Sequence, residues 1–200
     1  MEDDKTIKET VSYSLEPAFL FSTELIRLIA KAGTDPVNEW FFYDGAFTST
    51  TNLEIGSINT WVNENFVVIQ NRTIVAYFEG RWNRPLDIFS NFRVILFDKS
   101  KTIVFWNALY DYFDYLFQCR NCQALNWSVA LKNGHAYRIY EHFIKHSCGH
   151  RVGIRHHAQK SYTGQISDIV LYEITRDEYF AWKKKKTKEI DKYGRSKQYN

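Results

Sequence analysis

The chain has 200 residues, of which 44% are hydrophobic and 17% aromatic, and its net charge is +3. This composition suits one globular domain with a ring-rich core rather than two domains or a disordered chain. No apolar run is long enough to span a bilayer, which argues against a membrane protein.

The cysteine count and the start of the chain bear on its compartment. The three cysteines are odd in number, which is typical of a reducing environment. The first ten residues, MEDDKTIKET, are polar and acidic, which argues against export. We therefore predict a cytoplasmic protein without a membrane partner.

Charge is unevenly distributed along the chain. Residues 183–200 contain eight basic and two acidic residues, a net charge of +6, so the other 182 residues carry about −3. We expect one domain over residues 1–182 and a basic, solvated tail over 183–200. Such a tail can contact nucleic acid by counterion release, although lysine runs are more often only solvated.

The first half of the chain predicts two helices and three strands. A helix is expected over 14–32, because Ser14 is placed to cap it, Pro17 lies in its first turn and Gly33 follows its end. A weaker helix is expected over 51–64. Two β-rich runs flank Asn71-Arg72 and predict a hairpin, and a further strand follows; the three runs are 66–70, 73–79 and 88–97.

A third helix is expected over 102–118. Its polar residues fall on one narrow stripe and nearly everything else is apolar, so this helix is buried on most of its surface or meets a partner. The stripe comprises Asn107, Asp111, Asp114 and Gln118.

Next come a strand over 125–130, a helix over 133–147 and a closing hairpin of strands 150–157 and 165–174. The last strand is apolar on both faces, which predicts a central position in the sheet. The element order predicts an α/β fold: a mixed sheet of about six to seven strands flanked by about four helices, with right-handed crossovers.

The run LNWSVALKNGHAYRIYEHF, residues 125–143, places an asparagine between a strand and a helix and a tyrosine two turns into that helix. Asn133, Ala136 and Tyr140 in this run resemble the Asn-x-x-Ala-x-x-Leu-Tyr pattern of the GNAT superfamily of N-acetyltransferases. The expected element order also resembles the GNAT fold up to about Trp182. The resemblance implies that Asn133 helps to hold acetyl-CoA and that Tyr140 protonates the leaving thiolate. Spacing alone favours a packed ring of the helix's core face for Tyr140, and the element order around it brings the two interpretations to about even.

The chain departs from the family pattern at the phosphate-binding loop. GNAT enzymes follow their fourth strand with a glycine-rich loop whose amides cradle a pyrophosphate. Here the corresponding loop has no glycine; it comprises Asp98, Lys99, Ser100, Lys101 and Thr102. Either the lysines, the free amides and a hydroxyl bind the phosphates in another geometry, or the site has decayed and the fold serves binding or assembly.

A catalytic base and a metal site are less clearly indicated. Glu79, at the end of a predicted strand, is the candidate base, although such an acid is more often solvated or paired. A zinc site is an alternative chemistry, because a Cys-x-x-Cys pair and a later Cys-x-His pair have ligand spacing. Its residues are Cys119, Cys122, Cys148 and His150.

Two hypotheses of function follow. The first is an acyl-CoA-dependent N-acetyltransferase that moves an acetyl group from acetyl-CoA to a primary amine. The second is a catalytically inactive GNAT-fold binding or structural protein, associated with a virion and using the third helix to contact a protein partner or a second copy. The chain resembles small aromatic-rich proteins of bacterial viruses, which implies a phage origin and a location in the host cytoplasm or the virion.

Overall fold

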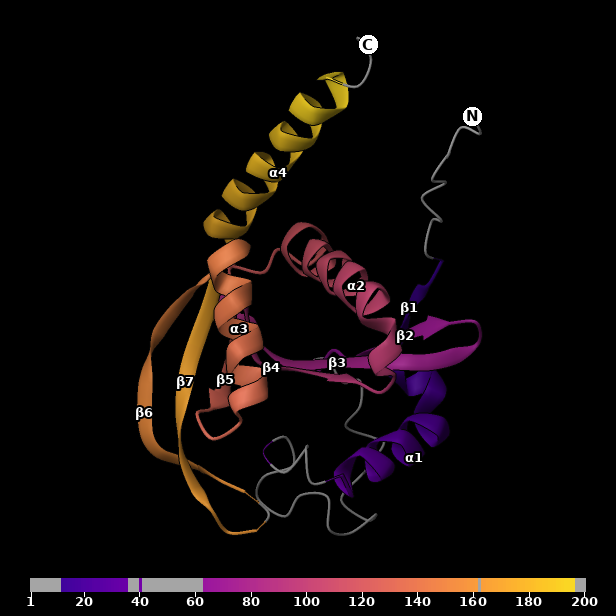
Figure 1. Ribbon diagram of the computed structural model, residues 1–200, viewed down its shortest axis with the longest axis vertical. Helices are drawn as coiled ribbons and strands as arrows, with labels where there is room; N and C mark the ends of the chain where they lie inside the picture. Colours follow the sequence, from indigo (N-terminus) through magenta and orange to yellow (C-terminus); the bar gives the residue numbers. More distant parts are fainter. Residues whose placement is uncertain (1–11, 36–39, 41–62, 162, 197–200) are drawn as a thin grey trace, which may run out of the picture.

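The computed structural model describes residues 12–35, 40, 63–161 and 163–196, with side chains as far as residue 188 in the last helix. Within these residues a seven-stranded mixed sheet carries four α-helices, as the sequence predicts (Figure 1). The strand order is β1-β2-β3-β4-β5-β7-β6. The strands are β1 Ser14–Pro17, β2 Phe66–Gln70, β3 Thr73–Asn83, β4 Ile88–Leu96, β5 Ala124–Ala130, β6 His150–Lys160 and β7 Ile166–Thr175; the helices are α1 Ser22–Gly33, α2 Thr102–Asp114, α3 Gly134–His146 and α4 Arg176–Ser196.

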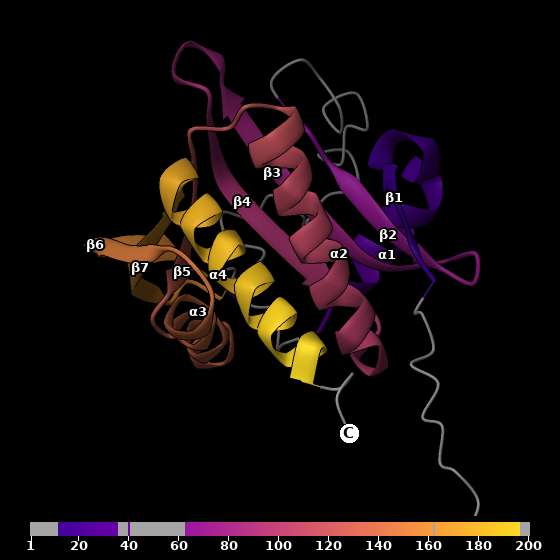
Figure 2. The same ribbon diagram turned by 90° about the horizontal axis from the view of Figure 1, so that it is seen from above.

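The sheet consists of two antiparallel halves, β1 to β4 and β5-β7-β6. The halves are joined by parallel pairing of β4 with β5, which is limited to Ile88 with Ala124 and Phe89 with Leu125. Figure 1 shows that the strands of the two halves run at a steep angle to each other. In Figure 2, α2 lies over the β1–β4 half, while α3 lies beside β5 and β7.

The start of the chain corrects one prediction. Ser14–Pro17 is not helical but pairs with β2 at the sheet edge, and a 3₁₀ turn over Ala18–Phe21 leads into α1. A proline suits both the first turn of a helix and an edge strand, because neither needs its missing N–H. The helix expected over 51–64 lies outside the described residues except for its end, where Asn63 forms a β-bridge with Arg81.

Two other predictions about strands are confirmed. Asn71 and Arg72 connect β2 to β3 with φ of 52° and 64°, the left-handed geometry of a two-residue hairpin turn. Strand β7 lies between β5 and β6, which explains why it is apolar on both faces.

The core is rich in aromatic rings on the face of the sheet that α2 and α3 cover. Tyr112 of α2 is fully buried and contacts rings from β3 and β4, including Phe78 and Phe92. Trp106 of the same helix stacks on Phe143, and Tyr110 stacks on Trp182. The aromatic surplus of the third predicted helix is therefore packed within the chain, and the idea of an exposed contact surface there is wrong.

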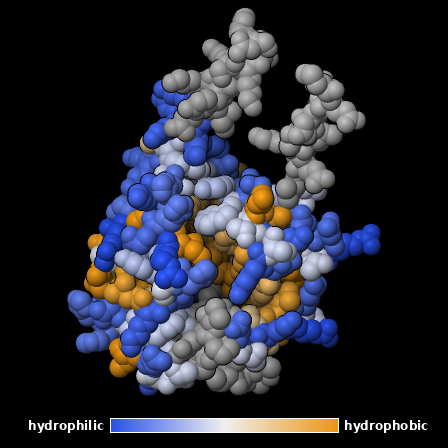
Figure 3. All heavy atoms as spheres, in the orientation of Figure 1, coloured by the Kyte–Doolittle hydropathy of each residue, from blue (hydrophilic) through white to orange (hydrophobic). Residues whose placement is uncertain are grey.

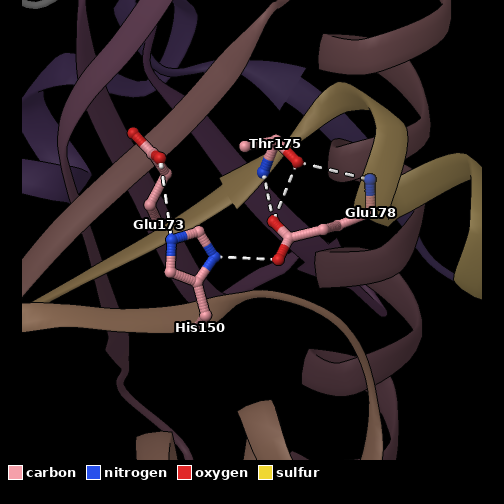
Figure 4. Close-up of polar contacts among 4 residues, drawn as sticks. All are labelled: His150, Glu173, Thr175 and Glu178. Atoms are coloured by element: carbon pink, nitrogen blue, oxygen red, sulfur yellow. Dashed lines mark hydrogen bonds and ion pairs between the residues drawn. The ribbon is translucent and has the colours of Figure 1, made fainter.

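Helix α4 runs as one helix through the predicted boundary at residue 182. Its start is fixed by a capping box: the Thr175 amide donates to Glu178 at 2.8 Å, and the Glu178 amide donates to the Thr175 hydroxyl at 3.3 Å (Figure 4). His150 Nδ1 lies 2.8 Å from the same carboxylate. Residues 183–196 are thus helical where the sequence suggested a fraying tail. None of the described helices has the length and apolarity needed to cross a membrane.

Candidate active site

The candidate site is a cavity of about 100 Å³ at the place where β4 and β5 separate. Its wall is formed by β4 and β5, by the start of α3, and by Gln159 and Trp40 on the side of β6. From these elements the lining residues are Asn91, Phe92, Arg93 and Val94; Ser128, Val129 and Ala130; and Asn133, Ala136 and Tyr140.

A β-bulge in β4 accompanies the separation of the two strands. Arg81 pairs with Ser90 and Glu79 with Arg93, so Asn91 and Phe92 together face Gly80 alone. Asn91 has φ of 53°, a left-handed conformation that asparagine tolerates better than most residues. Gly80 is required by close packing, because a Cβ at this position would lie 2.2 Å from the Phe89 ring.

Beyond Phe89 and Leu125, β4 and β5 have no further ladder pairing in the described chain. The backbone N–H and C=O groups on the facing edges of the two strands therefore do not hydrogen-bond to each other. We call the space between these diverging edges the wedge. A ligand in the wedge can form hydrogen bonds with these groups. An extended chain that contains amides can provide both the donors and the acceptors that these backbone groups need.

Tyr140 lies in the cavity wall and is also packed among rings. Its ring centroid is 5.6 Å from that of Trp127 and 6.0 Å from that of Tyr172. Burial raises the pKa of the Tyr140 phenol to about 12. Within the described residues its hydroxyl has no hydrogen-bond partner. The residue is thus a positioned phenol that stays protonated at neutral pH.

Asn133 has a structural role in addition to its place in the cavity. Its side-chain oxygen accepts a hydrogen bond from the Ala136 amide at 3.2 Å and so caps α3. Since the cap uses the oxygen, the side-chain NH₂ group is the part of Asn133 that can donate to a ligand.

The loop between β4 and α2 lies at the same sheet edge as the cavity, because β4 and β5 are parallel and both end there. Asp98 accepts hydrogen bonds from the Ser100 amide at 2.9 Å and the Ser100 hydroxyl at 2.7 Å, and its carbonyl accepts from the Lys101 amide at 3.0 Å. The bonds from Ser100 lower the pKa of Asp98. Two amides expected to be free for a phosphate are therefore occupied by the chain itself.

The basic groups of this loop remain available. Lys99 is exposed and Lys101 is partly exposed, and neither forms an ion pair in the described part of the chain. The Thr102 hydroxyl donates to the Lys99 carbonyl at 3.0 Å and stabilises the turn into α2. None of these residues lines the cavity, so the loop is separate from the wedge.

Glu79, the candidate base, does not line the cavity but contacts a residue that does. Its carboxylate forms an ion pair with Arg93 and accepts a hydrogen bond from the Tyr77 hydroxyl at 2.9 Å. The cross-strand register that places Glu79 opposite Arg93 explains this pair. The expectation that Glu79 is a paired acid is met by the geometry.

The zinc alternative has no support in the geometry. No three metal-binding side chains converge among the residues that the structure describes. Cys119 is exposed, whereas Cys122 and Cys148 are buried, and burial raises their pKa values to about 11 and about 12. His150 instead binds Glu178 and lies 3.9 Å from Glu173 (Figure 4).

Several residues of the cavity wall were missed by sequence reasoning. Asn91, Arg93 and Ser128 lie on strands whose apolar pattern hides them, and Gln159 reaches the cavity from β6 by donating a hydrogen bond of 2.7 Å to the Trp40 carbonyl. The Ser90-Asn91 pair, which interrupts the apolar residues at the start of β4, was the available signal for the bulge.

No protein-family model matches the chain, and no curated protein sequence matches it significantly. Several solved structures, however, match the chain in fold. The spermidine N-acetyltransferase of Vibrio cholerae in complex with CoA and spermine is 18% identical, with a TM-score of 0.64 over 84% of this chain and 98% of that one. A candidate acetyltransferase from T. thermophilus is 17% identical, with a TM-score of 0.63 over 86% and 90% of the two chains. At such low identity the likeness shows the fold alone.

Proposed function

We propose that this chain, which has the GNAT fold, is an N-acetyltransferase that uses acetyl-CoA to acetylate a primary amine. The observation that carries the proposal is the wedge between β4 and β5: two parallel strands that part after two residue pairs, with Asn133, Ala136 and Tyr140 in the wall.

The wedge suits the pantetheine arm of acetyl-CoA. That arm is a narrow chain with two amides, and the facing edges of β4 and β5 offer it backbone donors and acceptors. In this proposal, a backbone amide of β4 next to the bulge donates to the thioester carbonyl oxygen.

The chemistry requires two bond changes and two proton transfers. The amine nitrogen attacks the thioester carbon, the C–S bond breaks and the sulfur leaves as a thiolate. The Tyr140 phenol donates its proton to that thiolate. The attacking nitrogen loses a proton to a base, for which Glu79 is the candidate, and the carboxylate must release Arg93 to act in this way.

The loop after β4 supplies the binding of the phosphates in this proposal. Lys99 and Lys101 provide the positive charge, and Asn133 adds a side-chain donor from α3. Because Asp98 occupies two loop amides and adds a negative charge, we expect weaker binding of acetyl-CoA than a glycine-rich loop provides.

The inactive binding protein is the less favoured alternative. The cavity keeps a protonated phenol and unpaired strand edges, and α2 packs its rings inside the chain instead of presenting them to a partner. A phage origin, a cytoplasmic or virion location and the identity of the acceptor remain predictions.

Calorimetric titration with acetyl-CoA tests the proposal. We expect saturable binding that the pair of changes Lys99→Gln and Lys101→Gln weakens about ten-fold, since each lost charge pair costs roughly 0.5–1 kcal/mol. The matched control is Arg27→Gln with Lys31→Gln on α1, where the same charge is removed from another exposed surface.

A second assay follows thiol release with a panel of amines, including spermidine and lysine peptides. Absence of binding at millimolar acetyl-CoA contradicts the proposal. Binding without turnover on any amine favours the inactive alternative.

A further inference from the structure

Helix α4 carries a second feature, which lies apart from the cavity. After Lys183, which pairs with Asp114 of α2, the helix has an exposed lysine at four of the next five positions. These are Lys184, Lys185, Lys186 and Lys188, and we call them the α4 lysines. None of them forms an ion pair in the described part of the chain.

The helix leaves the body of the protein at this point. In Figure 1, α4 extends beyond the sheet and the other helices, and in Figure 3 its described part is covered mostly by hydrophilic residues. From Lys184 to its end at Ser196 the helix is about 20 Å long at 1.5 Å per residue. The side chains of residues 184–188, the described part of this segment, are exposed to solvent.

From these observations we propose that α4 is a binding element for double-stranded DNA. Successive residues of a helix point about 100° apart, so Lys184, Lys185 and Lys186 spread over about 200° of the helix circumference instead of forming one narrow stripe. A helix in the major groove of DNA has phosphates on both flanks, and a groove about 12 Å wide admits it.

Other polyanions fit this surface less well. An anionic membrane retains helices that also have an apolar face, and residues 184–188, KKKTK, provide none. An acidic protein surface would meet only one side of the helix and leave the other lysines solvated. The two acids that follow, Glu189 and Asp191, are balanced by Lys192 and Arg195, so the remaining sequence does not reverse the charge.

A groove next to the base of α4 extends the basic surface. Its lining includes Lys145 of α3 and Arg151 of β6, together with Glu141, whose carboxylate is held by the Tyr172 hydroxyl at 2.7 Å. His150, which also lines this groove, contacts Glu178 in the first turn of α4. A duplex that lies along the α4 lysines can therefore continue toward this groove.

Fluorescence anisotropy with a labelled duplex of about 20 base pairs and arbitrary sequence tests the inference. We expect the logarithm of the binding constant to fall with the logarithm of salt concentration with a slope of about −3 to −4, because each neutralised phosphate contributes about −0.9. Changing all four α4 lysines to Gln should weaken binding at least ten-fold at low salt and reduce the slope by about 3.

The matched control removes four charges elsewhere: Arg27, Lys31, Arg72 and Lys160 to Gln, all exposed. It should bind within about three-fold of the unchanged protein. An equal loss in both variants, or no binding by the unchanged protein, overturns the inference.

Vesicles with about 30% phosphatidylserine provide the competing partner, and binding to them without binding to the duplex also overturns the inference. Circular dichroism checks that the α4 variant stays folded, which is expected because Gln is a good helix former. If the variant unfolds, the inference is tested by the salt dependence of duplex binding by the unchanged protein. A slope near zero contradicts the inference. Neither outcome depends on acetyl-CoA.

Discussion

Tyr140 is a ring of the core, and in the proposed mechanism it is also the proton donor. Its contacts with Trp127 and Tyr172 fix the ring, and burial raises its pKa to about 12. An acid is useful to catalysis while it is protonated, which for this phenol means below about pH 12. The two sequence interpretations of Tyr140, packed ring and proton donor, are therefore compatible.

Changing Tyr140 to Phe keeps the ring and removes the proton. We expect the maximal turnover of acetyl transfer to fall about 10²- to 10³-fold at neutral pH with little change in the affinity for acetyl-CoA. In the unchanged enzyme, the high pKa of Tyr140 predicts no loss of activity from its ionisation up to about pH 11. The measurement is steady-state kinetics across pH, and an unchanged turnover in the Phe variant would remove Tyr140 from the mechanism.

Glu79 presents the opposite case, because its carboxylate already has partners. Changing Glu79 to Gln keeps a hydrogen-bond acceptor for Tyr77 and removes the ion pair with Arg93. If Glu79 is the base, turnover falls about 10²-fold and the activity loses its dependence on an acidic group. If Glu79 only positions Arg93, the Michaelis constant for the amine changes while the pH profile keeps its shape. Kinetics with saturating acetyl-CoA separate the two outcomes.

At the scale of elements, the β4 bulge and the glycine opposite it form one unit. An alanine Cβ at Gly80 would lie 2.2 Å from the Phe89 ring, at the last residue pair that joins the two halves of the sheet. We expect Gly80→Ala to destabilise the protein by about 1–3 kcal/mol, the usual cost of overpacking, and to weaken acetyl-CoA binding.

Gly153 on β6 provides the matched control for this change. An alanine Cβ at Gly153 would meet no atom within 4 Å, so Gly153→Ala should leave stability nearly unchanged. Urea unfolding of both variants gives the comparison. Equal stabilities would show that β4 absorbs the extra methyl group and that the bulge is not rigid.

The elements also show what sequence could and could not supply. The hairpin at Asn71-Arg72, the buried α2 and the central β7 follow from local turn chemistry and hydrophobic period, which a sequence displays directly. Strand β1 was missed, because Ser14 and Pro17 suit a helix start as well as an edge strand. Its strand conformation depends on pairing with β2, which the local sequence does not show.

The part of the site that depends on local sequence spacing was also predictable. Asn133 caps α3 and Tyr140 lies two turns into the same helix, so their spacing in sequence brings them to one cavity wall. The pairing of Glu79 with Arg93 and the bulge at Asn91 depend on the register between β3 and β4, which no local pattern specifies. The use of loop amides by Asp98 depends on the turn that the loop adopts.

At the scale of the whole molecule, the two halves of the sheet share one core but little ladder pairing near the site. Their strands share only two residue pairs, and the wedge beyond them is open to a ligand. A pantetheine arm between β4 and β5 would supply the backbone hydrogen bonds that the strands do not make to each other. Binding of acetyl-CoA should therefore stabilise the fold as a whole, and not only the loops that touch it.

The size of this effect can be predicted. A ligand that binds only the folded state at 100 times its dissociation constant adds about 2.7 kcal/mol to the free energy of unfolding. For a chain of this length, that corresponds to a rise in melting temperature of about 5–10 °C. Thermal denaturation with acetyl-CoA measures it, and adenosine 3′,5′-bisphosphate is the control, because it has phosphates but no pantetheine arm. A shift with acetyl-CoA and little with the bisphosphate places the binding energy in the wedge. Equal shifts would assign the binding energy to the basic loop. No shift at millimolar acetyl-CoA would contradict the proposal that this chain binds acetyl-CoA.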